Sequence, residues 1–174
     1  YVAKRIDSTL RGNLGAEIDA VLDAAGEGYR AAVVPVYPKS GRVCVGGYLL
    51  VNGTPLQLTE VAKDPKCPIR SSNVKELISS QTKRSIANIT LDIVAGGRKA
   101  ISDAFFQVKE DIVVFDAVTD DDIENIASAL SDQEKIICVD PGPFTAAFIE
   151  QKMGFQKQDG IFLILGSVSE LTTA

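Results

Sequence analysis

The sequence predicts an α/β fold with a mainly parallel sheet flanked by helices and a small β-hairpin insertion. Short β-branched runs of about four residues alternate with stretches of about ten residues that have helical periodicity, which is typical of a parallel sheet with helical crossovers. An Asn-Gly pair at 52–53 separates two extended runs and indicates a hairpin. With 174 residues, 45% of them hydrophobic, the chain is long enough to bury a core.

A strand, a helix and a second strand are expected first. Tyr1–Arg5 is a short apolar-rich run that reads as a strand. Over Gly15–Gly26, apolar residues from Ile18 to Ala25 recur with helical spacing, and glycines supply the stop signal. Ala31–Val36 then reads as a buried strand that leads to a proline.

The expected insertion follows, with short runs separated by glycine-containing turns. Its extended runs are Val43–Val45, Tyr48–Val51 and Pro55–Leu58. A loop with two prolines, Asp64–Pro68, comes next, and we interpret its Asp-Pro pair as the start of a turn.

Regular alternation then resumes to the end of the chain. The expected helices are Val74–Ser80, Arg98–Val108, Asp121–Leu130 and Phe144–Met153. The expected strands are Ile86–Val94, Ile112–Phe115, Ile136–Val139 and Ile161–Leu165.

Composition excludes several kinds of chemistry. The chain has no histidine, so Ser-His-Asp catalysis, Cys-His catalysis and His-ligated zinc cannot be built from its own residues. Its three cysteines, Cys44, Cys67 and Cys138, are far apart and odd in number, which favours reduced thiols in the cytoplasm and no metal cage. The net charge of −5 argues against nucleic-acid binding.

Membrane association is not expected either. No apolar run approaches the roughly 20 residues that a spanning helix needs. We therefore predict neither a membrane partner nor a secretory route for this chain. Its opening residues, Tyr1-Val2-Ala3, read as the interior of a longer protein.

The densest group of polar residues follows the first expected strand. Ligands of parallel α/β sheets bind beyond the carboxyl ends of the strands, and Lys4–Asn13 holds cations, a carboxylate, hydroxyls and an amide there. Arg11 could grip a carboxylate with two parallel hydrogen bonds, and Asp7 could orient or deprotonate a hydroxyl. The alternative is a solvated loop in which Ser8 or Asn13 caps the next helix.

Other motifs have simpler interpretations. Gly26–Ala31 matches a dinucleotide-binding pattern but lies between a helix and a strand, in the wrong order. Asp120-Asp121-Asp122 reads as a helix start favoured by capping rather than as a metal site. Asp140–Thr145 lies between a strand and a helix, where a phosphate could dock, but it reads better as a proline-rigidified helix start. No Walker A motif occurs.

The segment KRIDSTLRGNLGAE at Lys4–Glu17 closely resembles the signature of the four-carbon acid sugar kinase family. The resemblance continues in order along most of the chain. The further matching segments are Val33–Leu56, Thr59–Ser72, Val113–Ile123 and Leu163–Thr172. The opening Asp-Asp-x-Thr-Gly segment of the family is not among them, and Asp140–Pro143 departs from its usual Gly-Ser-rich turn.

The resemblance implies an ATP-dependent kinase that acts on threonate- or erythronate-like acids. It implies a substrate-binding α/β domain over residues 1–160, and a strand or linker over 161–174 that leads to a nucleotide-binding domain. ATP and Mg²⁺ would be bound mainly by that second domain. A non-catalytic module that binds an acid sugar without turnover stays as the alternative, and assembly into a homo-oligomer is left open.

The resemblance also implies a set of site residues. Asp7 would be the catalytic residue, and Ser167 would contact the nucleotide, with a simple turn hydroxyl as the alternative. Arg42 would be a second carboxylate or phosphate contact, with a surface arginine on the hairpin rim as the alternative. The residues implied at the substrate are Lys4, Asp7, Ser8, Thr9, Arg11, Asn13 and Arg42.

Overall fold

The structure of the chain is a computed structural model, and it describes residues 2–154. The main sheet contains β1 (Val2–Arg5), β2 (Arg30–Val33), β6 (Ile86–Ile89), β7 (Ile112–Phe115) and β8 (Ile136–Asp140). The helices are α1 (Leu14–Ala25), α2 (Val74–Ser79), α3 (Leu91–Ala95), α4 (Gly97–Gln107), α5 (Asp120–Leu130) and α6 (Pro143–Met153). The prediction of an α/β fold with a mainly parallel sheet is confirmed.

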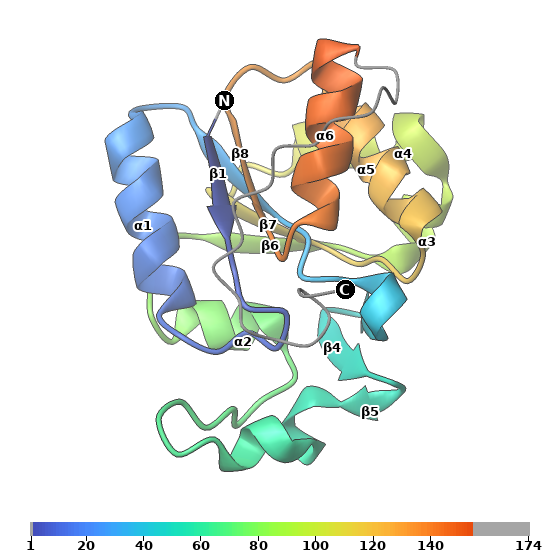
Figure 1. Cartoon of the computed structure of the whole chain (residues 1–174). Helices are drawn as coiled ribbons and strands as arrows, with labels where there is room; N and C mark the ends of the chain where they lie inside the picture. The colour runs from blue at the N-terminus through green and yellow to red at the C-terminus, as the bar shows by residue number, and fades with distance from the viewer. Residues whose placement is uncertain (1, 155–174) are drawn as a thin grey trace.

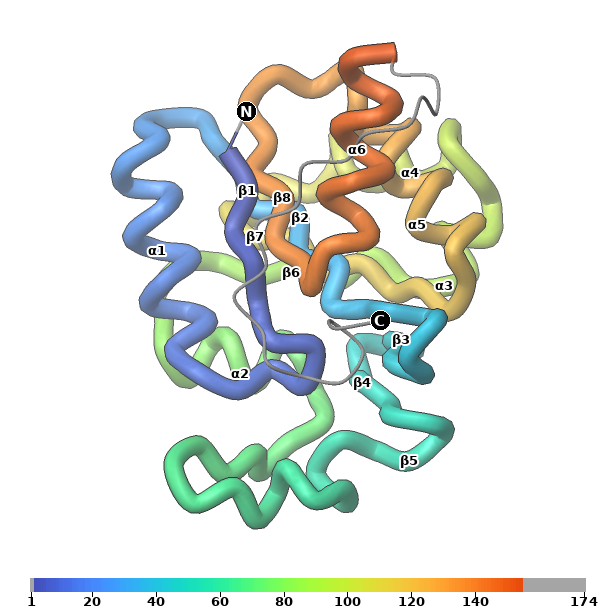
Figure 2. The backbone as a smooth tube through the Cα atoms, viewed as in Figure 1, coloured from blue at the N-terminus to red at the C-terminus, as the bar shows by residue number. Residues whose placement is uncertain are grey.

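The main sheet has the strand order β1-β8-β2-β7-β6, and every neighbouring pair is parallel. Helices α1 and α2 lie on one side of this sheet, and α4, α5 and α6 lie on the other (Figure 1). The backbone trace in Figure 2 shows β1 and β8 running side by side, with a second, smaller sheet beyond their carboxyl ends. Loops that follow these strands therefore gather at one edge of the molecule.

The core lies along the central strands. β7 and β8 are buried along their whole length, because each has a strand on both edges and helices on both faces. The rings of Phe105 and Phe115 stack there with centroids 6.1 Å apart. In contrast, three of the four residues of β1 are exposed, since within the described residues this strand pairs with β8 alone.

Helix α5 begins as predicted from its acidic run. The Thr119 side chain accepts the amide hydrogen bond of Asp122 at 3.1 Å, and the Asp122 carboxylate accepts the Thr119 amide at 2.9 Å. This reciprocal capping box satisfies two amides that have no partner within the helix.

Helix α6 also begins as predicted, with Pro143 in its first turn. The buried Asp140 carboxylate accepts hydrogen bonds from the amides of Gly142 at 2.7 Å and Phe144 at 2.8 Å. Burial raises the pKa of Asp140, although hydrogen bonds from Thr145 and these amides oppose the shift. The amides that would attract an anion at this helix start are thus already bound to a carboxylate.

The insertion is larger than the predicted hairpin. It is a three-stranded antiparallel sheet of β3 (Arg42–Val45), β4 (Tyr48–Val51) and β5 (Thr54–Pro55). Asn52 and Gly53 both have positive φ, 51° and 78°, as the predicted Asn-Gly turn requires. The expected extended run Pro55–Leu58 is wrong beyond Pro55, because Leu56–Leu58 forms a 3₁₀ turn that buries Leu56.

Two predicted strands are shorter in the structure. β6 ends at Ile89, and the next residues start α3, because the Asp116 carboxylate accepts the Leu91 amide at 3.1 Å and stabilises the new helix. β2 ends at Val33, two residues before Pro35, whose nitrogen cannot donate to a ladder.

Two further findings complete the fold. No helix within residues 2–154 is long and apolar enough to cross a membrane. The expected strand Ile161–Leu165 lies outside the described residues.

Candidate functional site

The loop between β1 and α1 adopts an unusual backbone. Leu10 has a positive φ of 60° although it carries a side chain, and Gly12 has a φ of 106°. Non-glycine residues rarely occupy this region, which costs of the order of 1 kcal/mol or more. The buried Leu10 side chain, only 2% exposed, packs into the core and holds the loop in this shape.

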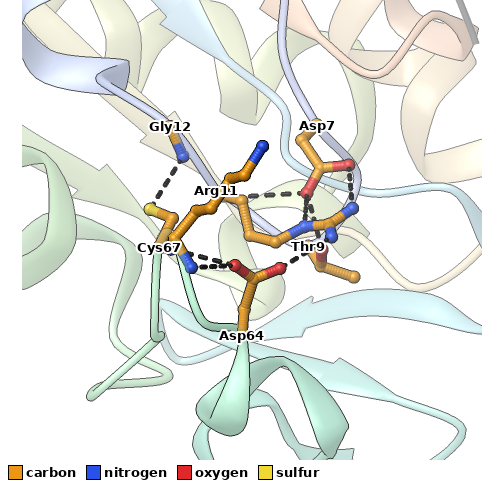
Figure 3. A network of polar contacts seen from close by, with 7 residues as sticks. Asp7, Thr9, Arg11, Gly12, Asp64 and Cys67 are labelled. Atoms are coloured by element: carbon orange, nitrogen blue, oxygen red, sulfur yellow. Dashed lines mark hydrogen bonds and ion pairs between the residues drawn. The ribbon is translucent and has the colours of Figure 1, made fainter.

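Asp7 is the hub of this loop. Its carboxylate accepts hydrogen bonds from Arg11 Nε at 2.8 Å, Arg11 Nη2 at 3.3 Å and the Arg11 amide at 3.3 Å. The buried Thr9 hydroxyl donates to the same carboxylate at 2.6 Å (Figure 3). Partial burial raises the pKa of Asp7, but the hydrogen bonds from Arg11 and Thr9 outweigh it and leave the pKa below its ordinary value. Asp7 is therefore ionised at neutral pH and is better suited to orienting a donor than to taking a proton.

Arg11 lies between two carboxylates. Beyond its contacts with Asp7, its Nη1 donates to Asp64 Oδ2 at 3.2 Å, across 53 residues of sequence (Figure 3). The hydrogen bond with Asp7 raises the pKa of Arg11; partial burial opposes the shift, and the charges of Asp7 and Asp64 add to it. The side chain is still 43% exposed, so its guanidinium is accessible from solvent.

Asp64 opens a turn, as predicted. Its Oδ1 accepts the amides of Lys66 and Cys67, both at 2.9 Å, and these two bonds together with Arg11 lower the pKa of Asp64. Cys67 Sγ in turn accepts the Gly12 amide at 3.2 Å. The turn therefore contacts the loop after β1 at two points, which the sequence interpretation did not foresee.

Three other predicted residues have different surroundings. Lys4 Nζ forms an ion pair with Glu17 at 2.6 Å and donates to the carbonyl of Arg5, so it is already bound within its own neighbourhood. Ser8 is half-buried, and Asn13 is exposed at the N-cap of α1 without a capping side-chain bond. The helix-cap alternative for Asn13 is wrong as regards its side chain.

Arg42 is not among the residues that these contacts join. Arg42 is the first residue of β3, and its guanidinium donates to the carbonyl of Ser40. Within the described residues it shares no hydrogen bond or ion pair with the loop after β1. Ser167 lies outside the described residues.

Arg5 is a cation at this edge that the sequence interpretation missed. Its guanidinium lies against Gly142, where a Cβ atom would collide with Nη1. Within residues 2–154, its side chain forms no hydrogen bond or ion pair. The sequence signal that could have found Arg5 is the alternation of side chains along β1. Because successive side chains of a strand point to opposite faces, Lys4 meets α1 and Arg5 meets the start of α6.

Asp116 is a second residue that was missed. This fully buried carboxylate at the end of β7 accepts the amides of Gly46 at 2.6 Å and Gly47 at 2.8 Å, besides that of Leu91. It therefore fastens the insertion to the main sheet. A charged residue directly after a strand as apolar as Ile112–Phe115 is the sequence signal that could have found it.

The structure also has a hollow of about 490 Å³ at the opposite edge of the sheet. Its lining includes Arg84, which forms ion pairs with Asp23 and Asp111 that also line the hollow. These charges compensate one another, and ligands of parallel sheets bind at the other edge. The loop after β1 is therefore the better candidate site.

The same residues offer few ligands for a metal ion. Within the part of the chain that the structure describes, no group of three or more acidic or cysteine side chains is arranged to hold a metal ion. The Arg11 guanidinium lies between the Asp7 and Asp64 carboxylates and forms an ion pair with each of them. These residues do not fit a metal–nucleotide site.

Known proteins that resemble this chain also point to a sugar-binding domain. Residues 1–148 match the family described as sugar-binding N-terminal domain. The chain is 45% identical to a D-erythronate kinase of Heliobacterium modesticaldum, over 97% of the chain and 40% of that protein. It is 36% identical to a D-threonate kinase of Salmonella typhimurium, over 98% of the chain and 41% of that protein. The chain thus spans about 40% of the length of these relatives.

Solved structures support the fold. A Haemophilus influenzae protein of the family DUF1537 aligns over 93% of the chain and 40% of its own length, with a TM-score of 0.78 and 24% identity. A Bordetella bronchiseptica DUF1537 protein, crystallised with citrate as a domain-swapped dimer, aligns over 87% of the chain and 37% of its own length, with a TM-score of 0.75 and 28% identity. The chain therefore belongs to the four-carbon acid sugar kinase family and matches its sugar-binding N-terminal domain.

Proposed function

We propose that this chain is the acid-sugar-binding part of an ATP-dependent kinase that phosphorylates a four-carbon acid such as D-erythronate. The observation that carries the proposal is the accessible Arg11 guanidinium, held by Asp7 at the carboxyl edge of a parallel sheet. Relatives named D-erythronate kinase and D-threonate kinase match nearly the whole chain. A family relative crystallised with citrate, a ligand rich in carboxylates, supports an acid as the ligand class.

Within this proposal the residues have distinct roles. Arg11 binds the carboxylate of the acid, because its planar guanidinium matches that group with directed, charged hydrogen bonds. Asp7 holds Arg11 in position and orients a hydroxyl of the acid. Ser8 and Asn13 are placed on the same loop, where their polar groups can bind the remaining hydroxyls, whereas the buried Thr9 hydroxyl holds the Asp7 carboxylate in position. Phosphoryl transfer depends mainly on such positioning and on charge neutralisation.

Two of the residues implied at the substrate take lesser roles. Lys4 is bound to Glu17 and to the carbonyl of Arg5, so it adds positive potential near the loop but lacks the planar, solvent-accessible donors of Arg11. Arg42 is bound to the carbonyl of Ser40, and among the described residues it shares no hydrogen bond or ion pair with the loop after β1.

The nucleotide is assigned to other parts of the protein. The described residues do not fit a metal–nucleotide site, so we place ATP and Mg²⁺ mainly on a nucleotide-binding domain outside residues 1–160, with Ser167 contacting the nucleotide. Residues 161–174 would form the connection to that domain. A cytoplasmic location and a homo-oligomeric assembly are further parts of the proposal, the second in keeping with the domain-swapped dimer of the Bordetella relative.

Binding and turnover test the proposal separately. Calorimetric titration of the chain with D-erythronate, with neutral erythritol as the control, should show saturable binding of the acid alone. The chain alone should not transfer phosphate from ATP, whereas a protein containing the complete kinase should. Equal binding of erythritol and D-erythronate would refute an acid-specific site, and turnover by residues 1–174 would refute the division into domains.

A further inference from the structure

The turn at Asp64–Cys67, which we call the strap, reaches the loop after β1 from a distant part of the chain. Asp64 Oδ2 accepts from Arg11 Nη1 at 3.2 Å, and Cys67 Sγ accepts from the Gly12 amide at 3.2 Å (Figure 3). The partners in these two contacts are 53 and 55 residues apart in the sequence. Two contacts at the centre of the candidate site are therefore made by one short turn.

The strap is built to present one carboxylate oxygen. Asp64 Oδ1 is bound by the amides of Lys66 and Cys67, which leaves Oδ2 for Arg11. The residues on either side are anchored, since the buried Ile69 donates its amide to the carbonyl of Val61 at 3.2 Å. The strap can therefore separate from Arg11 without unfolding the segments that flank it.

The two carboxylates on Arg11 are not held equally. Asp7 receives three hydrogen bonds from Arg11 and one from Thr9, whereas Asp64 receives a single bond from the guanidinium. A carboxylate that arrives from solvent would replace the partner with the fewest bonds. Asp64 can also be released at little cost, because the turn amides continue to bind its other oxygen.

Charge makes such a replacement necessary. Asp7 and Asp64 already give Arg11 two negative partners, so a third carboxylate added to both would crowd three like charges around one cation. A neutral polyol offers no charge with which to displace Asp64. The contact thus discriminates between acids and neutral sugars of the same length.

We propose that Asp64 is a specificity-determining residue, whose carboxylate occupies on Arg11 the position of the substrate carboxylate until an acid displaces it and releases the strap. This inference rests on the proposed function, because it takes a four-carbon acid as the ligand. It goes further in assigning to the strap the choice between acids and neutral polyols.

Cys67 provides a reporter of the strap. It is half-buried, whereas Cys44 and Cys138 are 0% and 3% exposed. Burial, followed by the charge of Asp140, raises the pKa of Cys138 to about 12, and burial together with Asp116 raises the pKa of Cys44. Because thiolates are the reactive form, a thiol reagent at neutral pH should label Cys67 first, at a rate that depends on strap opening.

The first experiment needs no ligand. Asp64→Asn keeps an oxygen to accept the turn amides but removes the charge that binds Arg11, so Cys67 should be labelled about two- to fivefold faster, the range expected for an exposed ion pair. Asp132→Asn also removes a carboxylate from an ion pair with an arginine, Arg98, although Asp132 is more exposed than Asp64, 74% against 22%; it should leave the labelling rate unchanged. An unchanged rate in Asp64→Asn, with Arg11→Gln also unchanged, would overturn the proposal.

The second experiment adds ligand. D-erythronate should accelerate Cys67 labelling of the unmodified chain, erythritol should not, and Asp64→Asn should bind D-erythronate about two- to fivefold more tightly. Equal dissociation constants for the two proteins would show that the acid does not displace Asp64 from Arg11, which would overturn this inference but leave the proposed function intact. Binding of D-erythronate to neither protein would refute the proposed function itself.

Discussion

Replacing Arg11 by lysine should weaken acid binding strongly while changing the fold little. The guanidinium donates to Asp7 through Nε and Nη2 and to Asp64 through Nη1, so three of its nitrogens have directed roles. An ammonium keeps the charge but cannot reproduce this planar arrangement. Loss of one charged hydrogen bond to the acid costs about 1.5–3 kcal/mol, which corresponds to a roughly ten- to hundredfold higher dissociation constant.

The fold should tolerate the same change, because Arg11 is 43% exposed and its ion pairs lie near solvent. Exposed pairs contribute about 0.2–1 kcal/mol each, so we expect the melting temperature to fall by only a few degrees, on the order of 2–4 °C. The assay is a calorimetric titration with D-erythronate, paired with a melting curve of each protein.

Arg98→Lys is the control, since Arg98 is similarly exposed, 55% against 43% for Arg11, and forms an ion pair with Asp132 at 2.6 Å. It should bind D-erythronate as the unmodified chain does. If Arg11→Lys keeps the original dissociation constant, Arg11 does not bind the acid. If it instead unfolds the chain, Arg11 is a structural residue and the site is misplaced.

Three further predictions concern stability. The pKa of Asp7 is lowered in the folded chain, so its ion pair stabilises the fold at pH values above the ordinary aspartate pKa and loses that effect as the pH falls through the lowered value. Asp7→Asn should therefore unfold at a lower urea concentration than the unmodified chain at pH 7. The difference in stability between the two proteins should disappear at strongly acidic pH. Gly142→Ala should lower the free energy of unfolding by about 1–3 kcal/mol, because its φ of 137° lies far from the left-handed helical region, and it should cost more than Gly97→Ala, whose φ of 76° lies close to that region. Asp116→Ala should lower stability by at least about 3 kcal/mol in urea unfolding, because it leaves three amides of the insertion and α3 without their acceptor.

Each of these predictions has a clear contrary result. A gap between Asp7→Asn and the unmodified chain that widens on acidification would reverse the assigned sign of the pKa shift. Equal losses in Gly142→Ala and Gly97→Ala would show that the backbone at Gly142 shifts to a φ that alanine tolerates. Normal stability of Asp116→Ala would mean that water replaces the carboxylate as the acceptor.

The sequence allowed most of the fold to be predicted because apolar periodicity reflects burial directly. Ile112–Phe115 and Tyr48–Val51 were predicted with their observed bounds. The errors arose where a distant group decided the local structure. The start of α3 within the expected strand Ile86–Val94 depends on Asp116, which is 25 residues away from the amide that it binds.

The site was predictable only where its contacts are local. Asp7, Thr9 and Arg11 belong to one short segment, so their chemistry could be read together. The approach of Asp64 to Arg11 depends on tertiary structure, which no local pattern contains. The sequence did not show which of Lys4 and Arg5 is held in an ion pair, because that depends on which helix packs on each face of β1.

The position of β1 has a consequence for local dynamics. This edge strand carries the loop with Asp7 and Arg11, and among the described residues its ladder is formed with β8 alone. Segments with few buried contacts open with smaller free energies than the whole domain, and their amides exchange with solvent deuterium sooner. The amides of β1 should therefore exchange before those of β2 and β7, and a ligand that slows their exchange would show that the site loop is ordered by what it binds.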